Sequence, residues 1–420
     1  MNSEQRTAVE CIVAGTSGAA PFLLHGPPGT GKTVTIVEAI LQLVKKNPSN
    51  RILVCAHSNT AVDNVACLLL KYTKTSFLRL NSASRKSPPK CLEEVGISGK
   101  LGAEVLISYR ILLCTLNLVS NYNLSFITHT IIDEAAQASE PSCLIPKSQN
   151  LILSGDFKQL GPVIISDDAK QYGLGVSLME RLKNTCPLYA KNNKKYIVML
   201  KKNYRSDADI IKLPNLLFYD GELEARAETD LISRTNILYK DKPCRAIVFH
   251  GVLSTEKKVG DPPSFCNRDE LIYIKKYVTK LLNTHGVKEE DIGIIATYSS
   301  QVVLIKEWVQ KHHLNIDVET VDAFQGQEKR VILISTVRGQ GKQRTNVKLG
   351  FITDEKRFNV ALTRAKAKVV VIGNPLSLST DPLWNKYITT CRKYGTYYGL
   401  TETSSDEDEL AAVIKKISLK

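Results

Sequence analysis

The sequence lacks any long hydrophobic run. None of its apolar stretches approaches the roughly 20 residues that a membrane-spanning helix requires. The N-terminus also shows no basic segment followed by an apolar one, which is the pattern of a secretory signal. We therefore predict a soluble chain without a membrane span.

Metal-binding and disulfide patterns are missing as well. The 10 cysteines include no pair with C-x-x-C spacing, and the seven histidines form no metal-binding spacing. His312 and His313 are adjacent near the end of a predicted helix, where solvation is the simpler interpretation. The cysteines fit buried, reduced thiols of a cytosolic or nuclear protein, so we expect neither a zinc site nor a disulfide framework.

Composition is ordinary except for its charge. Hydrophobic residues make up 43% of the chain and charged residues 23%, which excludes a disordered or collagen-like chain. Lys and Arg number 56 against 42 Asp and Glu, a formal net charge of +14. This excess favours polyanionic partners such as nucleic acid or nucleotide, between which charge alone does not choose.

Short apolar runs alternate with helical patterns, which indicates an α/β fold with parallel sheets. The expected strands are 22–25, 52–56, 111–115, 130–132, 151–153, 246–249, 293–296, 331–335 and 369–372, and the expected helices are 32–44, 60–70, 269–282 and 301–312. No repeat of fixed period is present.

The rhythm of these elements divides the chain into two α/β domains. We predict a first domain over 1–165, a linker region over 166–200, a second domain over 201–395 and a solvated C-terminal tail over 396–420. The segment 81–102 is rich in Ser, Pro, Lys and Gly and is expected to be a surface insertion. The first motif stands at residue 5, so we expect the core of a longer protein.

The segment Gly26–Thr33 fits the phosphate-binding pattern G-x-x-x-x-G-K-[ST] and lies between an apolar strand and a helix. Its glycines let backbone N–H groups wrap phosphates, and the helix N-terminus favours negative charge. Lys32 is expected to reach the β and γ phosphates, and the Thr33 hydroxyl to ligate Mg²⁺. The residues expected to bind nucleotide here are Gly26, Pro27, Gly29, Thr30, Gly31, Lys32 and Thr33.

Two further strand ends carry polar groups suited to the same chemistry. Asp133 and Glu134 follow an apolar strand, so Asp133 is expected to hold Mg²⁺ and Glu134 to orient and deprotonate the attacking water. Gln159 lies shortly after the next strand, where its amide is expected to sense the γ-phosphate beside Glu134.

In this order these motifs resemble superfamily 1 helicases, and the second half of the chain extends the likeness. The segments Asn203–Ser206, Val321–Glu328 and Phe358–Lys366 look like the opening of a second RecA-like domain, motif V and motif VI. The finer match is to the up-frameshift type of 5′-to-3′ RNA helicases (group 1B), closest to the Moloney-leukaemia-virus-10 and Armitage branch. The resemblance implies two tandem RecA-like domains of the P-loop NTPase fold.

The resemblance also implies roles for residues outside the phosphate loop. Gln5 matches the glutamine that reads the adenine edge of ATP, Tyr204 matches the aromatic residue that stacks on adenine, and Glu328 matches the residue near the ribose. Arg205 and Arg364 match the two arginines that act on the γ-phosphate, where positive charge stabilises developing oxyanions. Together with Lys32, Glu134 and Gln159, these arginines form the expected catalytic set.

Contacts to single-stranded RNA are expected at matching loops of both domains. Hydroxyls, amides and loop N–H groups there suit phosphates and sugars, which hold a strand without reading its sequence. The expected residues are Ser58, Asn59, Thr60, Thr115, Tyr298, Gln301, Thr320 and Asp322. Ala296–Tyr298 departs from the family's Thr-Pro-Tyr, and we expect the accessory domains of this branch to be absent.

The resemblance thus predicts an ATP- and Mg²⁺-dependent RNA helicase or translocase core. It implies a cytoplasmic location, in ribonucleoprotein granules, and RNA-mediated silencing of the piRNA type with Argonaute or Piwi partners; nothing indicates an oligomer. Two alternatives stay open: an RNA-binding clamp that uses ATP only to set its grip, and a DNA helicase of the same superfamily. A GTPase is disfavoured because no N-K-x-D segment is present.

Overall fold

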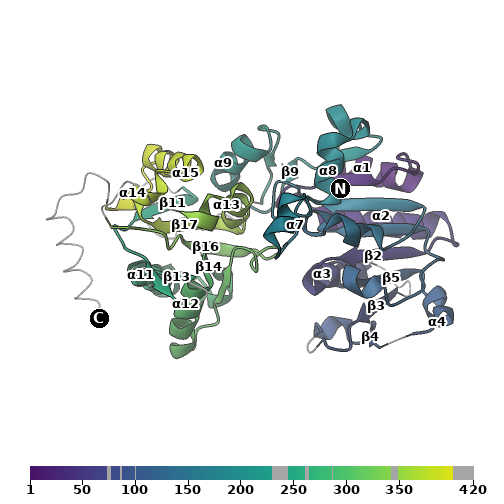
Figure 1. The fold of residues 1–420 in the computed structure, drawn as a ribbon, viewed down its shortest axis with the longest axis horizontal. Coiled ribbons are helices and arrows are strands. Elements are labelled where there is room, and N and C mark those ends of the chain that lie inside the picture. Colours follow the sequence, from purple (N-terminus) through teal and green to yellow (C-terminus); the bar gives the residue numbers. More distant parts are fainter. Residues whose placement is uncertain are drawn as a thin grey trace. The chain divides into compact units, whose positions relative to one another are not determined.

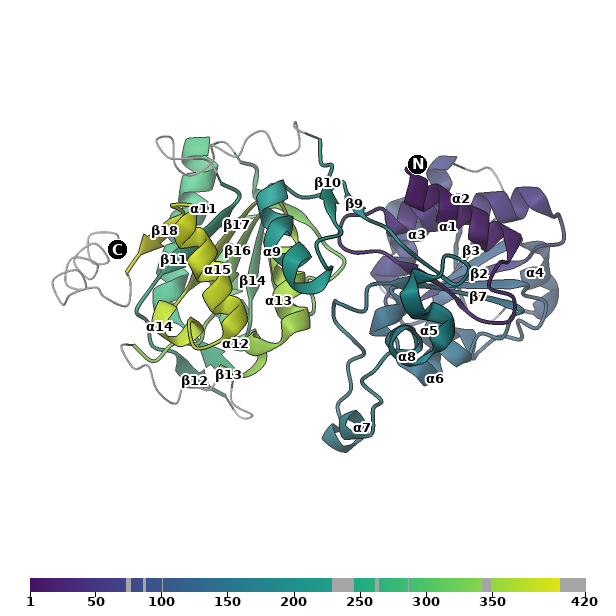
Figure 2. The ribbon, with the colours of Figure 1, turned by 90° about the horizontal axis from the view of Figure 1, so that it is seen from above.

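The computed structural model describes residues 1–72, 77–85, 88–99, 101–228, 245–260, 264–285, 287–341 and 349–400. The chain divides into two compact units, Met1–Asn203 and a second that begins at Tyr204. Each is described by itself below, and Figures 1 and 2 label their elements.

A parallel sheet forms the centre of the first unit. Within the described part of this unit its order is β4-β3-β5-β2-β6-β7-β1-β8, and every neighbouring pair is parallel. The strands are β1 (Phe22–His25), β2 (Ile52–Ala56), β3 (Phe77–Asn81), β4 (Gly96–Ser98), β5 (Ile111–Thr115), β6 (His129–Asp133), β7 (Asn150–Gly155) and β8 (Ile197–Met199). The central strands are almost continuously apolar because both of their faces are buried.

Helices cover both faces of this sheet. The helices are α1 (Ser3–Ala14), α2 (Lys32–Lys46), α3 (Asn59–Tyr72), α4 (Ala103–Ser108), α5 (Leu116–Val119), α6 (Glu140–Leu144), α7 (Asp167–Gln171) and α8 (Leu178–Thr185). Buried residues of α1, α2 and α3 form the core on one face, and those of α4, α5, α6 and α8 join the core on the other. Figure 2 shows α7 standing away from the sheet.

The two edge strands of the first sheet, β4 and β8, correct the predicted domain boundaries. The predicted linker region 166–200 contains α8 and the strand β8, which pairs with β1 as part of the sheet. The predicted surface insertion 81–102 contains the edge strand β4, and its Leu92 is buried in the core. In 81–102 an edge strand of three residues and a single 3₁₀ turn (Lys90–Leu92) leave little pattern to detect, and in 166–200 the apolar strand β8 is itself only three residues long.

The second unit is built on another parallel sheet. In its described part the order is β15-β14-β16-β17-β11-β18, again with parallel neighbours. The strands are β11 (Ile247–Gly251), β14 (Ile292–Ala296), β15 (Asp317–Thr320), β16 (Lys329–Ser335), β17 (Ala365–Gly373) and β18 (Tyr397–Gly399). The predicted α/β class with parallel sheets is confirmed. Strand β18 also shows that the predicted tail 396–420 begins inside the sheet; residues 401–420 lie outside the described residues.

Helices again lie on both faces of the second sheet, as Figure 2 shows. They are α9 (Ala208–Phe218), α11 (Arg268–His285), α12 (Ser299–Lys311), α13 (Glu355–Leu362), α14 (Pro375–Leu378) and α15 (Pro382–Lys393). α11 and α12 pack on one face. On the other face, Phe358 of α13 contacts Phe218 of α9 and Trp384 of α15 edge to face. Short strands β9 (Lys202–Asn203), β10 (Glu224–Ala225), β12 (Lys257–Val259) and β13 (Ser264–Cys266) complete the described strands.

Local sequence explains where several helices begin. Asn2 and Gln5 form a reciprocal capping box at α1, and Asp381 caps α15, whose first residue is proline. Among the described residues, no helix is long and apolar enough to cross a membrane.

Candidate nucleotide site and nucleic-acid interface

The phosphate loop connects β1 to α2, in the strand–loop–helix context that the motif requires. Gly29 and Gly31 have φ of 68° and 85°, left-handed conformations that glycine adopts without strain. Gly26 is needed for another reason: a Cβ added there would lie 2.0 Å from Cγ of Lys32. The loop therefore folds closely around the stem of this lysine.

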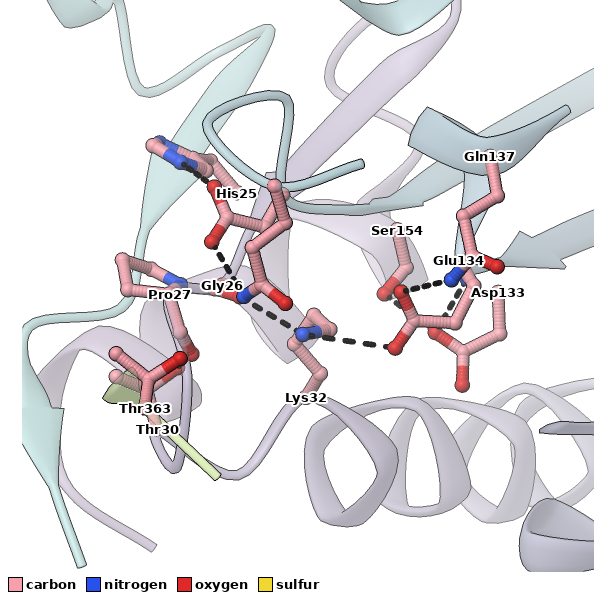
Figure 3. Close-up of polar contacts among 12 residues, drawn as sticks. His25, Gly26, Pro27, Thr30, Lys32, Asp133, Glu134, Gln137, Ser154 and Thr363 are labelled. Atoms are coloured by element: carbon pink, nitrogen blue, oxygen red, sulfur yellow. Dashed lines mark hydrogen bonds and ion pairs between the residues drawn. The ribbon is translucent and has the colours of Figure 1, made fainter. Parts of the chain in front are cut away.

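Figure 3 shows Lys32 between the loop and the end of β6. Its ammonium donates a hydrogen bond to the Gly26 carbonyl at 2.8 Å and lies 3.8 Å from Oε1 of Glu134. Because β6, β7 and β1 are neighbours in the sheet, their carboxyl ends bring Lys32, Asp133 and Glu134 together. Sequence reasoning predicted this convergence, and the geometry places the lysine beside both acids.

Asp133 is buried in this site, 3% exposed. Its Oδ1 accepts hydrogen bonds from the Glu134 backbone N–H at 2.9 Å and from the Ser154 hydroxyl at 3.1 Å. Burial and the neighbouring Glu134 raise the pKa of Asp133 to about 6, although Lys32 and these hydrogen bonds lower it. Two adjacent carboxylates beside one lysine are an arrangement that a divalent cation stabilises.

The donor set therefore fits Mg²⁺. Asp133 and the Thr33 hydroxyl, next to Lys32 at the start of α2, would hold the ion. A bound Mg²⁺ supplies charge neutralisation for phosphate oxygens.

Glu134 adopts a left-handed conformation with φ of 51° and ψ of 39°, which is unusual for a residue with a side chain. Its Oε2 accepts a hydrogen bond from the Gln137 amide at 3.2 Å. Strained residues of this kind cost about 1–3 kcal/mol and concentrate at functional sites. With this backbone conformation the Glu134 carboxylate lies 3.8 Å from the Lys32 ammonium, a position that suits a base acting on water.

A buried polar chain follows β7. The Gln159 amide donates a hydrogen bond to the Asp156 carboxylate at 2.8 Å, and this carboxylate lies 3.1 Å from Nε2 of His25. The imidazole ring of His25 stacks on the ring of Phe157. Gln159 thus lies shortly after β7, as predicted, and its amide is held inside this network; its sensing of the γ-phosphate stays a prediction. Sequence reasoning missed His25 and Asp156, although the neighbouring ends of β1 and β7 could have indicated the pair.

Two other polar side chains support the phosphate loop. Gln5 is buried and its amide donates to the Thr30 carbonyl at 3.2 Å. Asn203 is fully buried and donates to the Pro28 carbonyl at 2.7 Å. The sequence assigns Asn203 to the motif that opens the second domain, whereas in the structure it is the last residue of the first unit and contacts the phosphate loop.

In the second unit, Glu328 is the centre of an ion-pair cluster. It pairs with Arg205 and with Lys366 at 2.8 Å. Burial alone would raise the pKa of Glu328, but the two cations outweigh it and hold the pKa below its usual range. Arg364 is 2% exposed and its guanidinium donates to the Val360 carbonyl at 3.1 Å and the Gln327 carbonyl at 3.4 Å. Tyr204 is 42% exposed.

The predicted strand contacts of the first unit gather at one edge of its sheet. Ser58, Asn59 and Thr60 follow β2 and are exposed, and Thr115 ends the neighbouring strand β5. The Ser58 hydroxyl accepts from the Ala61 backbone N–H at 3.2 Å, so it caps α3. Asn59 accepts from buried Arg79 at 2.8 Å, which fixes the side chain at this edge.

The predicted contacts of the second unit differ among themselves. Thr320 ends β15 and its hydroxyl accepts from the Ala323 N–H at 3.3 Å; Asp322 accepts two hydrogen bonds from Arg357, at 3.0 and 2.9 Å. Tyr298 is 8% exposed and its hydroxyl donates to the Leu349 carbonyl.

The prediction for Gln301 was wrong. Its side chain is fully buried, accepts from the Asn267 N–H at 2.8 Å and donates to Ser335 at 3.0 Å. The first turn of α12 faces the core at this position, which the motif spacing did not reveal.

A buried carboxyl near Gln301 gives a prediction for stability. Burial raises the pKa of Glu270 to about 8, against its ordinary 4.5, although hydrogen bonds from Ser335 and the Val337 N–H oppose the shift. Between these pH values the folded chain holds a proton that the unfolded chain has lost, so unfolding free energy falls as pH rises. Glu270→Gln, which stays neutral, should remove this dependence: relative to the parent, the variant gains stability from pH 5 to 8 in urea denaturation. Glu307→Gln, on the exposed face of α12, is the control, and parallel pH curves for Glu270→Gln and the parent would contradict the assignment.

Comparison with known proteins agrees with this geometry. Residues 1–98 and 79–167 match a family model described as an AAA domain, and residues 174–376 match a second model of that description. The chain is 40% identical to the helicase mov-10-B.1 of Danio rerio, covering 98% of this chain and 45% of that protein.

Two other relatives are similar over as much of the chain. Identity is 37% to the RNA helicase Mov10l1 of Mus musculus (95% of this chain, 36% of that protein) and 33% to the ATP-dependent helicase NAM7 of Saccharomyces cerevisiae (98% and 45%). The chain spans less than half the length of each of these relatives. With a phosphate loop, an acidic strand end and the arginine motifs in family order on two RecA-like units, the chain belongs to the MOV-10 and up-frameshift type of helicases.

Proposed function

We propose that the chain is the ATP-hydrolysing core of an RNA helicase or translocase that moves 5′ to 3′ on single-stranded RNA. The observation that carries the proposal is the position of Lys32, held by the Gly26 carbonyl at 2.8 Å and 3.8 Å from Glu134, beside buried Asp133. A lysine and two acids at the end of a phosphate loop are the parts that phosphoryl transfer requires. Membership of the helicase family supports the coupling to nucleic acid.

Each residue then has a proposed role in turnover. Lys32 neutralises charge on the β and γ phosphates, and Thr33 and Asp133 hold Mg²⁺. Glu134 takes the proton of the attacking water, and its left-handed backbone keeps its carboxylate aimed at the site.

The remaining nucleotide contacts are proposed from the family motifs. Gln5 and Tyr204 bind adenine, and Glu328 lies near the ribose. Gln159 senses the γ-phosphate, and Arg205 and Arg364 stabilise its developing charge. In this proposal both guanidinium groups are held by other partners until nucleotide binds. Arg205 is held by its ion pair with Glu328, and Arg364 by its hydrogen bond to the Val360 carbonyl.

The strand is proposed to contact the exposed residues Ser58–Thr60 and the half-buried strand ends at Thr115 and Thr320. Relatives named as RNA helicases, Mov10l1 among them, support action on RNA. From the family resemblance we further propose a role in RNA silencing or ribonucleoprotein remodelling. With it we propose cytoplasmic granules as the location and Argonaute or Piwi proteins as partners. Co-purification of the full-length protein with such a partner, and its loss after ribonuclease treatment, tests this part.

The central test is steady-state ATP turnover by this chain with no nucleic acid, with single-stranded RNA and with single-stranded DNA of the same sequence. Strong stimulation by RNA is expected, followed by unwinding of duplexes with 5′ tails but not 3′ tails. If single-stranded DNA stimulates ATP turnover as strongly as RNA does, the proposed substrate becomes DNA. Binding of RNA without any stimulation of ATP turnover would instead identify a clamp. If the chain shows no RNA binding and no stimulation, the proposal is overturned.

A further inference from the structure

A pocket of about 710 Å³ lies at the carboxyl end of the second sheet, outside the predicted nucleotide site. Its lining follows the ends of strands β14 and β16 and includes the 3₁₀ turn η5 (Gly350–Thr353). The groups used below are Ser264, Phe265, Tyr298, Arg338, Phe351 and Arg357. In parallel α/β sheets, ligands bind outside the carboxyl ends of the strands, and Thr320 and Asp322 follow β15 at that same edge.

The pocket is made of aromatic rings with arginines laid over them. The guanidinium of Arg338 lies 4.2 Å from the ring centroid of Phe265 and 5.7 Å from that of Tyr298. The guanidinium of Arg357 lies 5.2 Å from that of Phe351. Such planar stacks attract other planar groups, because guanidinium and aromatic faces both pair with π systems.

Acids neutralise both arginines. Arg338 pairs with Glu256 at 3.3 Å, and Arg357 pairs with Asp322 at 2.9 Å. A free phosphate would meet little net positive charge here, so the pocket suits a flat, uncharged group. Its rim hydroxyls, such as that of Ser264, can exchange hydrogen bonds with the polar edge of such a group.

Strained backbone fixes Arg338 in this position. The preceding residue, Val337, has φ of 68°, a left-handed conformation that is costly for a β-branched residue. Glu270 accepts from the Val337 N–H at 2.9 Å, and Asn267 donates to the Val337 carbonyl at 2.9 Å. Tyr298 then accepts from Arg338 at 3.1 Å. A buried network thus holds the arginine rigidly at the pocket, as a preorganised ligand site needs.

Phe351 is the exposed member of the set, with 63% of its surface accessible. One side of the ring is covered by Arg357, and the ring stands at the mouth of the pocket beside Tyr298, with centroids 6.3 Å apart. Aromatic side chains are the surfaces on which bases of single strands stack in proteins that bind them.

We propose that this pocket receives one unstacked nucleobase of a single-stranded nucleic acid, with Phe351 as its stacking surface. The proposal rests on the proposed function, since it assumes that a strand crosses this edge of the sheet. It adds a base contact to a set of predicted contacts that otherwise reach only phosphates and sugars.

The test measures the affinity of the chain for fluorescein-labelled single-stranded RNA by anisotropy. Phe351→Ala should weaken binding about 5- to 150-fold, the range of one base–aromatic stack, whereas Phe351→Trp keeps it. Leu216→Ala, which removes a similarly exposed apolar side chain on α9, is the control and should bind as the parent does. Melting temperatures of all variants verify folding.

A second arm separates base stacking from general damage. Strands carrying abasic sites should bind the parent more weakly, and Phe351→Ala should show little further loss on those strands, because the two changes remove the same contact. Equal affinity of Phe351→Ala and the parent for normal RNA, or full additivity of the two losses, would overturn the pocket assignment while RNA-stimulated turnover still stands. A parent chain that binds no RNA overturns both proposals.

Discussion

Glu134→Gln is expected to lower RNA-stimulated ATP turnover by about 10²- to 10⁴-fold, the usual contribution of a positioned general base. The amide has the shape of the carboxylate and can still accept from Gln137, the hydrogen bond that Glu134 makes at 3.2 Å. What it cannot do is take a proton from water. Turnover is measured by phosphate release at saturating ATP and RNA.

The variant should still bind ATP, because Lys32 and the loop glycines are unchanged. Equilibrium binding of a fluorescent ATP analogue is expected to stay within about twofold to threefold of the parent, a difference of roughly 0.6 kcal/mol or less. Glu140→Gln is the matched control: it removes a surface ion pair with Arg181 in the same unit and should leave turnover intact. Turnover by Glu134→Gln equal to that of the parent would remove Glu134 from the mechanism.

Much of the fold was predictable because buried parallel strands leave a strong pattern. Ile52–Ala56 and Ile111–Thr115 were predicted with the observed bounds, since continuous apolar runs such as theirs are typical of strands covered on both faces. Strands β3, β4, β8, β15 and β18 of the two sheets were missed. Strands β4, β8 and β18 are three residues long and too short to show a period, and charged residues such as Arg79 in β3 and Asp317 in β15 interrupt the apolar run.

The nucleotide site was predictable to the extent that its chemistry is local in sequence. Lys32 and Thr33 belong to one motif, and Asp133 and Glu134 follow one strand. The partners that hold these groups come from distant segments: Asn203 reaches the loop from 175 residues away, and Ser154 reaches Asp133 from the next strand. No single motif records such pairs, because they depend on the order of strands in the sheet.

Gln301 and Arg338 also show what motifs do not reveal: the first was assigned a contact that it does not make, and the second was not assigned any role. Motif likeness placed Gln301 at the strand interface, whereas the fold buries it in the network around Asn267 and Glu270. Arg338 lies in a stretch that no motif reading singled out, yet this network and the strained Val337 hold it at a pocket. Helical phase and backbone strain decide these positions, and neither is visible in spacing alone.

Lys32→Ala should fail at an earlier step than Glu134→Gln. The ammonium would donate charged hydrogen bonds to phosphate, each worth about 1.5–3 kcal/mol, so ATP binding is expected to weaken roughly ten- to hundredfold. Turnover at saturating ATP should fall a further 10²- to 10³-fold, as when one preorganised donor to a developing oxyanion is removed. Titration of the fluorescent analogue and phosphate release measure the two losses separately.

Lys46→Ala is the matched control, because Lys46 lies at the other end of α2 and donates to the Val13 carbonyl at 2.7 Å. It should change neither quantity. The pair of variants also tests the geometry of Figure 3, in which Lys32 lies between the loop and Glu134. If Lys32 serves both binding and turnover, the double variant Lys32→Ala/Glu134→Gln should hydrolyse ATP only slightly more slowly than the slower of the two single variants. The reason is that the effects of residues that act as one unit are not additive. Fully multiplicative losses would mean that the two side chains act at independent steps, which the 3.8 Å between them argues against.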